Sequence, residues 1–139
     1  MKGLDTNILI RYLAQDDAAQ SPLATQILEQ YLSEQVPAFV SLITMVETVW
    51  VLSSHFKMSD AQVAAAIERL LAADALNIQN EQQVFQAMIA LKNGTGTFSD
   101  ALIGAMGLWA GCSSTLTFDE KAARTLTGFQ LVSASVQLQ

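Results

Sequence analysis

Four acidic residues stand where their carboxylates can act together, namely Asp5, Glu47, Asp100 and Asp119. Carboxylates that converge within a few ångströms repel one another, and some take up protons unless a cation compensates them. Mg²⁺ suits this role because it prefers oxygen ligands, and Mn²⁺ accepts the same donors. Such an ion can activate water and stabilise the oxygen that leaves a phosphodiester. The residue types therefore indicate a divalent-cation site suited to phosphoryl chemistry.

The segments that must position these acids alternate between strand and helix patterns. Strands are predicted over 2–5, 37–41, 75–78, 114–118 and 129–132, and the strand over 114–118 is expected to be buried. Helices are predicted over 6–14, 18–34, 43–54, 60–73, 80–92, 99–111 and 119–125. This alternation favours an α/β layered fold with a mostly parallel sheet. A length of 139 residues fits a single domain over 1–139.

The predicted elements bring the four acids to one edge of the sheet. Asp5 and Asp119 each end a strand, Glu47 lies in the first turns of a helix, and Asp100 opens the helix 99–111. In an open α/β sheet, the ends of parallel strands and the starts of the following helices share one edge, where such folds bind ligands. We therefore expect the four carboxylates to converge in space.

Several neighbours of the acids carry hydroxyl groups. Thr6 and Thr117 flank two of the acids and are candidates to hold a water or a phosphate oxygen. Thr97 or Ser99 is the expected cap of the helix that Asp100 opens. These hydroxyls extend the predicted site from metal ligands to substrate binding.

A structural role is the alternative for each acid. Asp5, Asp100 and Asp119 could each serve only as a helix cap. Glu47 is harder to explain in this way, because it lies within the apolar run from Ile43 to Leu52, where a charge is rarely buried without a partner. Asp16 and Asp17 are interpreted as solvent-exposed caps of the next helix.

The single histidine and the single cysteine exclude other chemistries. His55 follows a helix end and is interpreted as a surface or capping residue, which argues against a histidine-rich zinc site and a Ser-His-Asp triad. Cys112 is expected to be a packed core thiol; one cysteine allows no internal disulfide and fits a reducing cytoplasm. Trp50 and Trp109 are expected in the core or at an interface.

The charge balance argues mildly against a nucleic-acid substrate. The formal net charge is -6, whereas nucleic-acid binders usually carry excess Lys and Arg. Cations bound among the acids would reverse the local field. Lys92, Lys121 and Arg124 lie near predicted site elements and could contact RNA phosphates, with surface solubility as the alternative. No apolar run is long enough for a membrane span, and the N-terminus does not read as a signal peptide.

Four ordered fragments together carry a resemblance to a known family. They are Asp5-Thr6-Asn7 before an apolar helix, Glu47 within MVETVWVL, Ser99-Asp100-Ala101-Leu102-Ile103, and Thr117-Phe118-Asp119. In this order and spacing they resemble the PIN-domain nucleases, and more closely the VapC-type toxins of bacterial toxin–antitoxin pairs. The resemblance extends over nearly the whole chain.

The resemblance implies a three-layer α/β/α fold whose central, mostly parallel sheet has about four or five strands. It implies a Mg²⁺- or Mn²⁺-dependent ribonuclease, with Asp5, Glu47, Asp100 and Asp119 lining the metal site. It further implies a homodimer that is silenced by a small antitoxin. Thr97 departs from the family, which often has a further acid there; Glu120 is a partial substitute.

Two other functions remain open. One is a binding protein whose acidic pocket receives an Arg of a partner without catalysis. The other is a different phosphoesterase activity on the same scaffold, because the fold alone does not determine the reaction.

Overall fold

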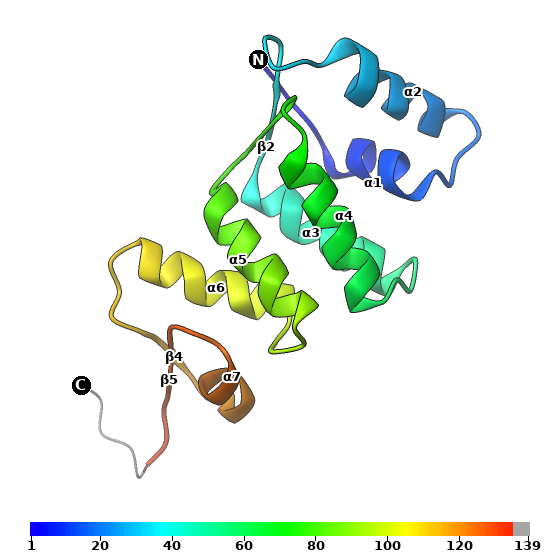
Figure 1. Ribbon diagram of the computed structural model, residues 1–139. Helices are drawn as coiled ribbons and strands as arrows, with labels where there is room; N and C mark the ends of the chain where they lie inside the picture. Colours follow the sequence, from blue (N-terminus) through cyan, green and yellow to red (C-terminus); the bar gives the residue numbers. More distant parts are fainter. Residues whose placement is uncertain (135–139) are drawn as a thin grey trace. The chain divides into compact units, whose positions relative to one another are not determined.

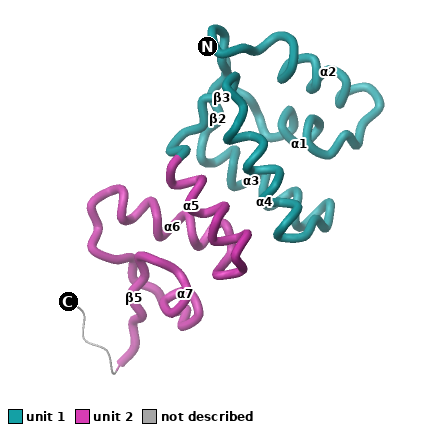
Figure 2. Tube along the Cα trace, viewed as in Figure 1, with its two compact units in different colours: residues 1–81 teal, residues 82–139 magenta. Residues whose placement is uncertain are grey.

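The structure is a computed structural model, which describes residues 1–134. The chain divides into two compact units, unit 1 over Met1–Glu81 and unit 2 from Gln82 onward (Figure 2). Within residues 1–134 there are seven α-helices and five strands, and all strand pairs are parallel (Figure 1). The predicted α/β class with parallel strands is confirmed. The predicted domain over 1–139 includes residues 135–139, which lie outside the described part.

A three-stranded parallel sheet forms the centre of unit 1. Strand β1 spans Lys2–Gly3, β2 spans Ala38–Val40 and β3 spans Leu76–Ile78, in the order β1-β2-β3. The middle strand is the most buried, since Ala38 and Val40 are both 0% exposed. The pairing continues past the strands, because Leu4 N donates to Phe39 O at 2.9 Å and Gln79 N donates to Val40 O at 2.9 Å. The carboxyl ends of the three strands therefore share one edge.

The helices of unit 1 agree with the predicted segments. Helix α1 spans Thr6–Ala14, α2 spans Gln20–Gln26 and continues as a π-helical turn over Ile27–Tyr31, α3 spans Leu42–Ser54 and α4 spans Asp60–Ala72. Ser59 caps α4: Ser59 and Gln62 form a reciprocal capping box, which satisfies two backbone N–H groups. Helix α1 packs against both α2 and α3.

Unit 2 contains a parallel pair of strands. Helix α5 begins at the unit boundary and spans Glu81–Lys92; α6 spans Phe98–Trp109, β4 spans Thr115–Thr117, α7 spans Glu120–Thr125 and β5 spans Phe129–Leu131. Gly104 of α6 is needed for packing, because a Cβ there would lie 2.8 Å from Thr127 O and 2.8 Å from Phe129 Cε2. Helix α6 thus lies directly on the segment that leads into β5.

Two predictions of burial in unit 2 are wrong. The segment 114–118 was expected to be buried, but Leu116 is 54% exposed and Phe118 is 85% exposed. Within the described residues β4 pairs with β5. The apolar residues of β4 predicted a strand, but they did not predict which side chains another element would bury. Cys112 was expected in the core but is exposed. It follows Gly111, whose φ of 96° turns the chain away after α6 ends.

Of the two places expected for the tryptophans, the core is wrong, since Trp50 is 66% exposed and Trp109 is 64% exposed, and an interface stays a prediction. Helix α3 buries Met45, Thr48, Val49 and Leu52, and Trp50 follows Val49 by one residue, which turns it roughly 100° from that face. Across residues 1–134 the structure contains no helix with the length and apolar character needed to cross a membrane.

Candidate active site

Asp5 lies two residues after the end of β1 and caps α1. Its Oδ1 accepts a hydrogen bond from Thr6 N at 2.7 Å, and its backbone oxygen accepts from Ile8 N at 3.1 Å. Asp5 is therefore a helix cap, and its role as a metal ligand stays a prediction. A cap does not exclude a ligand, because a carboxylate has two oxygens and about four lone-pair sites. Asp5 is exposed while Thr6 behind it is buried, so the carboxylate is held in place at the surface.

Glu47 lies in the second turn of α3 and is exposed. The argument that its apolar surroundings would bury the charge is wrong. The apolar residues on either side are distributed around the helix, so that Met45 and Val49 face inward while Glu47 faces solvent. The Glu47 carboxylate is available to a ligand because it is on the outer side of α3.

A pocket of about 490 Å³ in unit 1 joins these two acids. Asp5, Thr6 and Glu47 all line it, so the structure brings three predicted site residues together. The remaining lining residues come from α1, from α3 and from the two residues that follow α3: Asn7, Ile10, Arg11, Trp50, Val51, His55 and Phe56. Because α1 and α3 pack against each other, the pocket is a groove between them.

Three polar residues of this groove were not assigned to the site from the sequence. Asn7 and Arg11 are four residues apart in α1, and His55 is eight residues after Glu47 in α3. Side chains four apart lie on one helix face, so two such steps from Glu47 could have found His55, whereas no predicted site residue lies three or four positions from Arg11. His55 is exposed at the end of α3, as predicted, and its ring contacts Phe56 edge-on at 4.8 Å.

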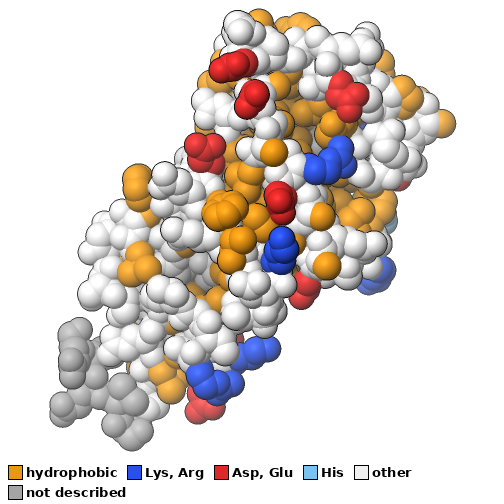
Figure 3. All heavy atoms as spheres, viewed as in Figure 1, with side chains coloured by type: hydrophobic (Ala, Val, Ile, Leu, Met, Phe, Trp, Pro, Cys, Tyr) orange, Lys and Arg blue, Asp and Glu red, His pale blue; other side chains and the backbone are white. Residues whose placement is uncertain are grey.

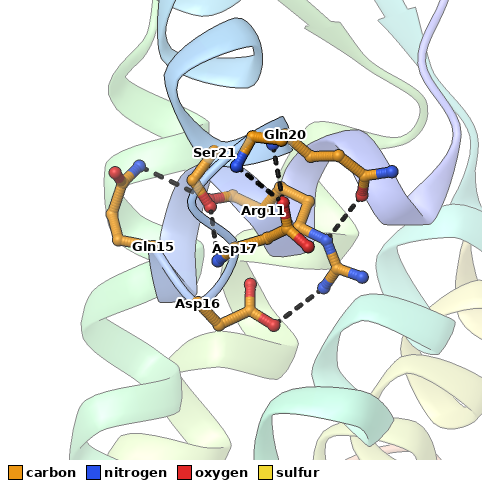
Figure 4. Close-up of polar contacts among 7 residues, drawn as sticks. Arg11, Gln15, Asp16, Asp17, Gln20 and Ser21 are labelled. Carbon is orange, nitrogen blue, oxygen red and sulfur yellow. Dashed lines mark hydrogen bonds and ion pairs between the residues drawn. The ribbon is translucent and has the colours of Figure 1, made fainter.

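Arg11 is held by a polar network at the start of α2 (Figure 4). Its Nη1 forms an ion pair with Asp16 Oδ2 at 2.8 Å, and its Nε donates to Gln20 Oε1 at 2.8 Å. Asp17 was interpreted as an exposed cap, and it does accept hydrogen bonds from Gln20 N and Ala19 N. These bonds lower the pKa of Asp17 below its ordinary value, with the bond from Gln20 contributing most. The capping role predicted for Asp16 is wrong, since Asp16 pairs with Arg11 instead.

Asp100 and Asp119 lie in unit 2. Asp100 is half-buried in the first turn of α6, where Thr97 Oγ1 accepts from Asp100 N at 3.1 Å; Thr97 rather than Ser99 is therefore the cap. Asp119 caps α7, because its Oδ1 accepts from Ala122 N at 3.0 Å. Thr117 supports this cap by accepting from Asp119 N at 3.0 Å. Asp119 is thus also a helix cap, and its role as a metal ligand stays a prediction.

The predicted phosphate-binding cations lie in unit 2 as well. Lys92 is the last residue of α5, and Lys121 and Arg124 are exposed on α7. Figure 3 draws one face of the molecule, on which Lys and Arg side chains are exposed at the surface. Binding of RNA phosphates by these three residues stays a prediction.

The convergence of all four acids stays a prediction, since Asp5 and Glu47 belong to unit 1 and the other two to unit 2. Within residues 1–134 no group of three or more His, Cys, Asp or Glu side chains is arranged to hold a metal ion. The groove of unit 1 nevertheless fits a hard cation in its donor chemistry. Mg²⁺ is usually bound by one or two protein carboxylates and completes its shell with waters and phosphate oxygens.

A comparison with known protein families yields one match. The model of the family described as PIN domain matches residues 3–126. The match runs through both units and contains all four candidate acids. No curated protein matches the chain.

Proposed function

The chain belongs to the PIN domain family, and from this premise we propose that it is a metal-dependent endoribonuclease that acts as the toxin of a toxin–antitoxin pair. PIN domains are typically metal-dependent nucleases, and the family generally uses a divalent metal. The observation that carries the proposal is the groove of unit 1, where Asp5 and Glu47 line one pocket. RNA as the substrate and the toxin role are supported by the ordered motifs of the sequence.

In this proposal Asp5, Glu47, Asp100 and Asp119 hold a Mg²⁺ or Mn²⁺ ion. When bound, the ion supplies positive charge that stabilises the negative oxygens of the phosphodiester. Asp5 is oriented for this role by the hydrogen bond from Thr6 N. Thr117 helps to orient Asp119, since its hydroxyl accepts from Asp119 N, and the O–H of the same hydroxyl can donate to a phosphate oxygen.

The decisive experiment compares carboxylates inside and outside the groove. We expect Asp5→Asn and Glu47→Gln each to lower the rate of single-stranded RNA cleavage roughly 100-fold or more, because each removes charge that acts on the reacting phosphate. Asp74→Asn is the matched control, since Asp74 is an exposed acid of unit 1 that does not line the groove. Removal of divalent metal with EDTA should abolish cleavage. Full activity in either groove variant, with unchanged circular dichroism, would refute the proposal.

The proposed partners are a small antitoxin and a second copy of the chain. A toxin role predicts that expression of the chain arrests growth, and that coexpression of a short neighbouring gene restores it. A homodimer predicts a solution mass of twice 15.0 kDa by light scattering. Growth arrest that persists in the Asp5→Asn variant would separate toxicity from cleavage.

A binding protein is the second candidate, and the donor set in unit 1 favours it. Two carboxylates on an open groove also suit the planar guanidinium of an Arg, which binds carboxylates in pairs of hydrogen bonds. A titration of Mg²⁺ and Mn²⁺ against RNA separates the candidates, because a binding protein leaves the RNA intact at every concentration. Hydrolysis of a small phosphoester in the same titration, with RNA left uncut, would instead favour a general phosphoesterase.

A further inference from the structure

We propose that the groove between α1 and α3 binds unpaired RNA by stacking a base on Trp50, with Arg11 donating to a neighbouring phosphate. This inference rests on the proposed function for the identity of the nucleic acid. It starts from the indole of Trp50, which is 66% exposed and lines the same pocket as Asp5 and Glu47. Unlike Trp109, Trp50 is open beside a guanidinium and two carboxylates, and this combination suits an occupant with a flat apolar face and a phosphate.

The position of Trp50 relative to Glu47 suits one nucleotide. The two residues are three apart in α3, so they are neighbours on the helix surface, separated by a rise of roughly 4.5 Å. A base stacked on Trp50 would therefore place its own phosphate near the Glu47 carboxylate. His55 lies eight residues beyond Glu47, roughly 12 Å along the axis, which is too far to contact the same phosphate.

The walls of the groove fit a base better than a backbone alone. Ile10, Val51 and Phe56 provide apolar surface around Trp50. The volume of about 490 Å³ lies within the range of roughly 300–1,000 Å³ typical of small-molecule sites. Every nucleobase has a π-face, but bases within a duplex are already stacked and paired. The groove should therefore select single-stranded over double-stranded RNA.

Arg11 supplies the charge that a phosphate needs in a groove that otherwise carries two carboxylates. A guanidinium has five N–H donors, and the bonds to Asp16 and Gln20 use one each from Nη1 and Nε. Arg11 can keep both bonds and still donate to a phosphate from its remaining N–H groups. The network in Figure 4 holds the guanidinium in place, so less side-chain entropy is lost on binding.

The chain contains a matched control for Trp50. Trp109 has almost the same exposure, 64%, and lies in unit 2 outside the groove. The fluorescence of the Trp109→Phe variant comes from Trp50 alone, and that of the Trp50→Phe variant comes from Trp109 alone. Both are titrated with a short single-stranded RNA and with its duplex, in the Asp5→Asn background with EDTA, so that neither cleavage nor metal is required. We expect single-stranded RNA to quench Trp50 and not Trp109, and the duplex to quench neither.

Affinity measurements extend the test beyond fluorescence. Trp50→Ala should weaken binding of single-stranded RNA roughly five- to 150-fold, the loss expected for one base stack. Trp50→Phe should retain most of the affinity, and Trp109→Ala should leave the affinity unchanged.

Arg11→Gln should lower the slope of log affinity against log salt concentration by about one. Arg69→Gln, which alters a cation of unit 1 outside the groove, should leave this slope unchanged.

Three outcomes of the binding measurements themselves would overturn the inference. They are equal quenching of both tryptophans, tighter binding of the duplex, and a Trp50 emission that changes with protein concentration in the absence of RNA. The last would mean that a second copy of the chain covers Trp50. Cleavage without quenching would reject this inference alone, whereas quenching by an inactive wild-type protein would reject the proposed function and leave the groove as an RNA-binding site.

Discussion

Asp5 and Asp119 have the same local environment in two different units of the molecule. Each follows a short parallel strand, and each caps the next helix with its carboxylate, Asp5 to Thr6 N and Asp119 to Ala122 N. Their wider surroundings differ. Helix α1 packs against α3, which adds Glu47 to the groove beside Asp5, whereas Asp119 begins a six-residue helix that buries Ala122. The comparison shows that a strand–Asp–helix pattern produces a cap in both places, and that the packing of α1 against α3 adds a second acid to the groove beside Asp5.

The largest expected effect tests whether the two units unfold together. Phe98 of α6 is 2% exposed, and Phe98→Ala should reduce the free energy of unfolding by about 3–5 kcal/mol through the cavity it leaves. If residues 1–139 form one domain, as predicted, urea unfolding followed by tryptophan fluorescence stays a single transition. Trp50 and Trp109 report on units 1 and 2 respectively, so a transition that shifts for Trp109 alone would show that the units are independent domains.

A second prediction separates capping from ligation at the two aspartates. Serine caps helices about as well as aspartate but has no carboxylate. Asp5→Ser and Asp119→Ser should therefore each preserve stability, while RNA cleavage falls roughly 100-fold or more. Asp5→Ala and Asp119→Ala add a loss of about 1 kcal/mol in unfolding free energy, because the cap is also removed. Normal cleavage by Asp119→Ser would show that Asp119 is only a cap and would end its equivalence with Asp5.

The smallest expected effect concerns a third capping aspartate, Asp17 of unit 1. Hydrogen bonds from Gln20 N and Ala19 N lower its pKa in the folded state below the ordinary value of 3.8. The folded state thus binds a proton less readily than the unfolded state, so Asp17 stabilises the fold above pH 3.8 and loses this contribution as the pH falls through the lowered pKa. Thermal melts of Asp17→Asn should show a weaker loss of stability with acid than the parent chain. If the melting temperatures of the variant and the parent chain fall equally with pH, Asp17 does not contribute to the acid dependence of stability.

Much of the local structure was predictable from the sequence. The helix predicted over 6–14 matches α1 at both ends, and Thr97, the cap of α6, was one of the two residues predicted for that role. These features depend on interactions between residues a few positions apart, such as a side-chain oxygen and the first backbone N–H groups of a helix. The acids Asp5 and Glu47 were found for the same reason, because their positions relative to strand and helix ends are local properties.

The tertiary structure alone decided which surfaces are covered. Glu47 and Trp50 lie in an apolar run yet face solvent, and Leu116 of β4 is exposed despite its apolar strand. It also decided that Arg11 of α1 lines a groove with Glu47 of α3, although the two are 36 positions apart. The physical reason is that burial depends on which element packs against a face. That contact joins residues distant in sequence, so a periodic pattern within one element cannot specify it.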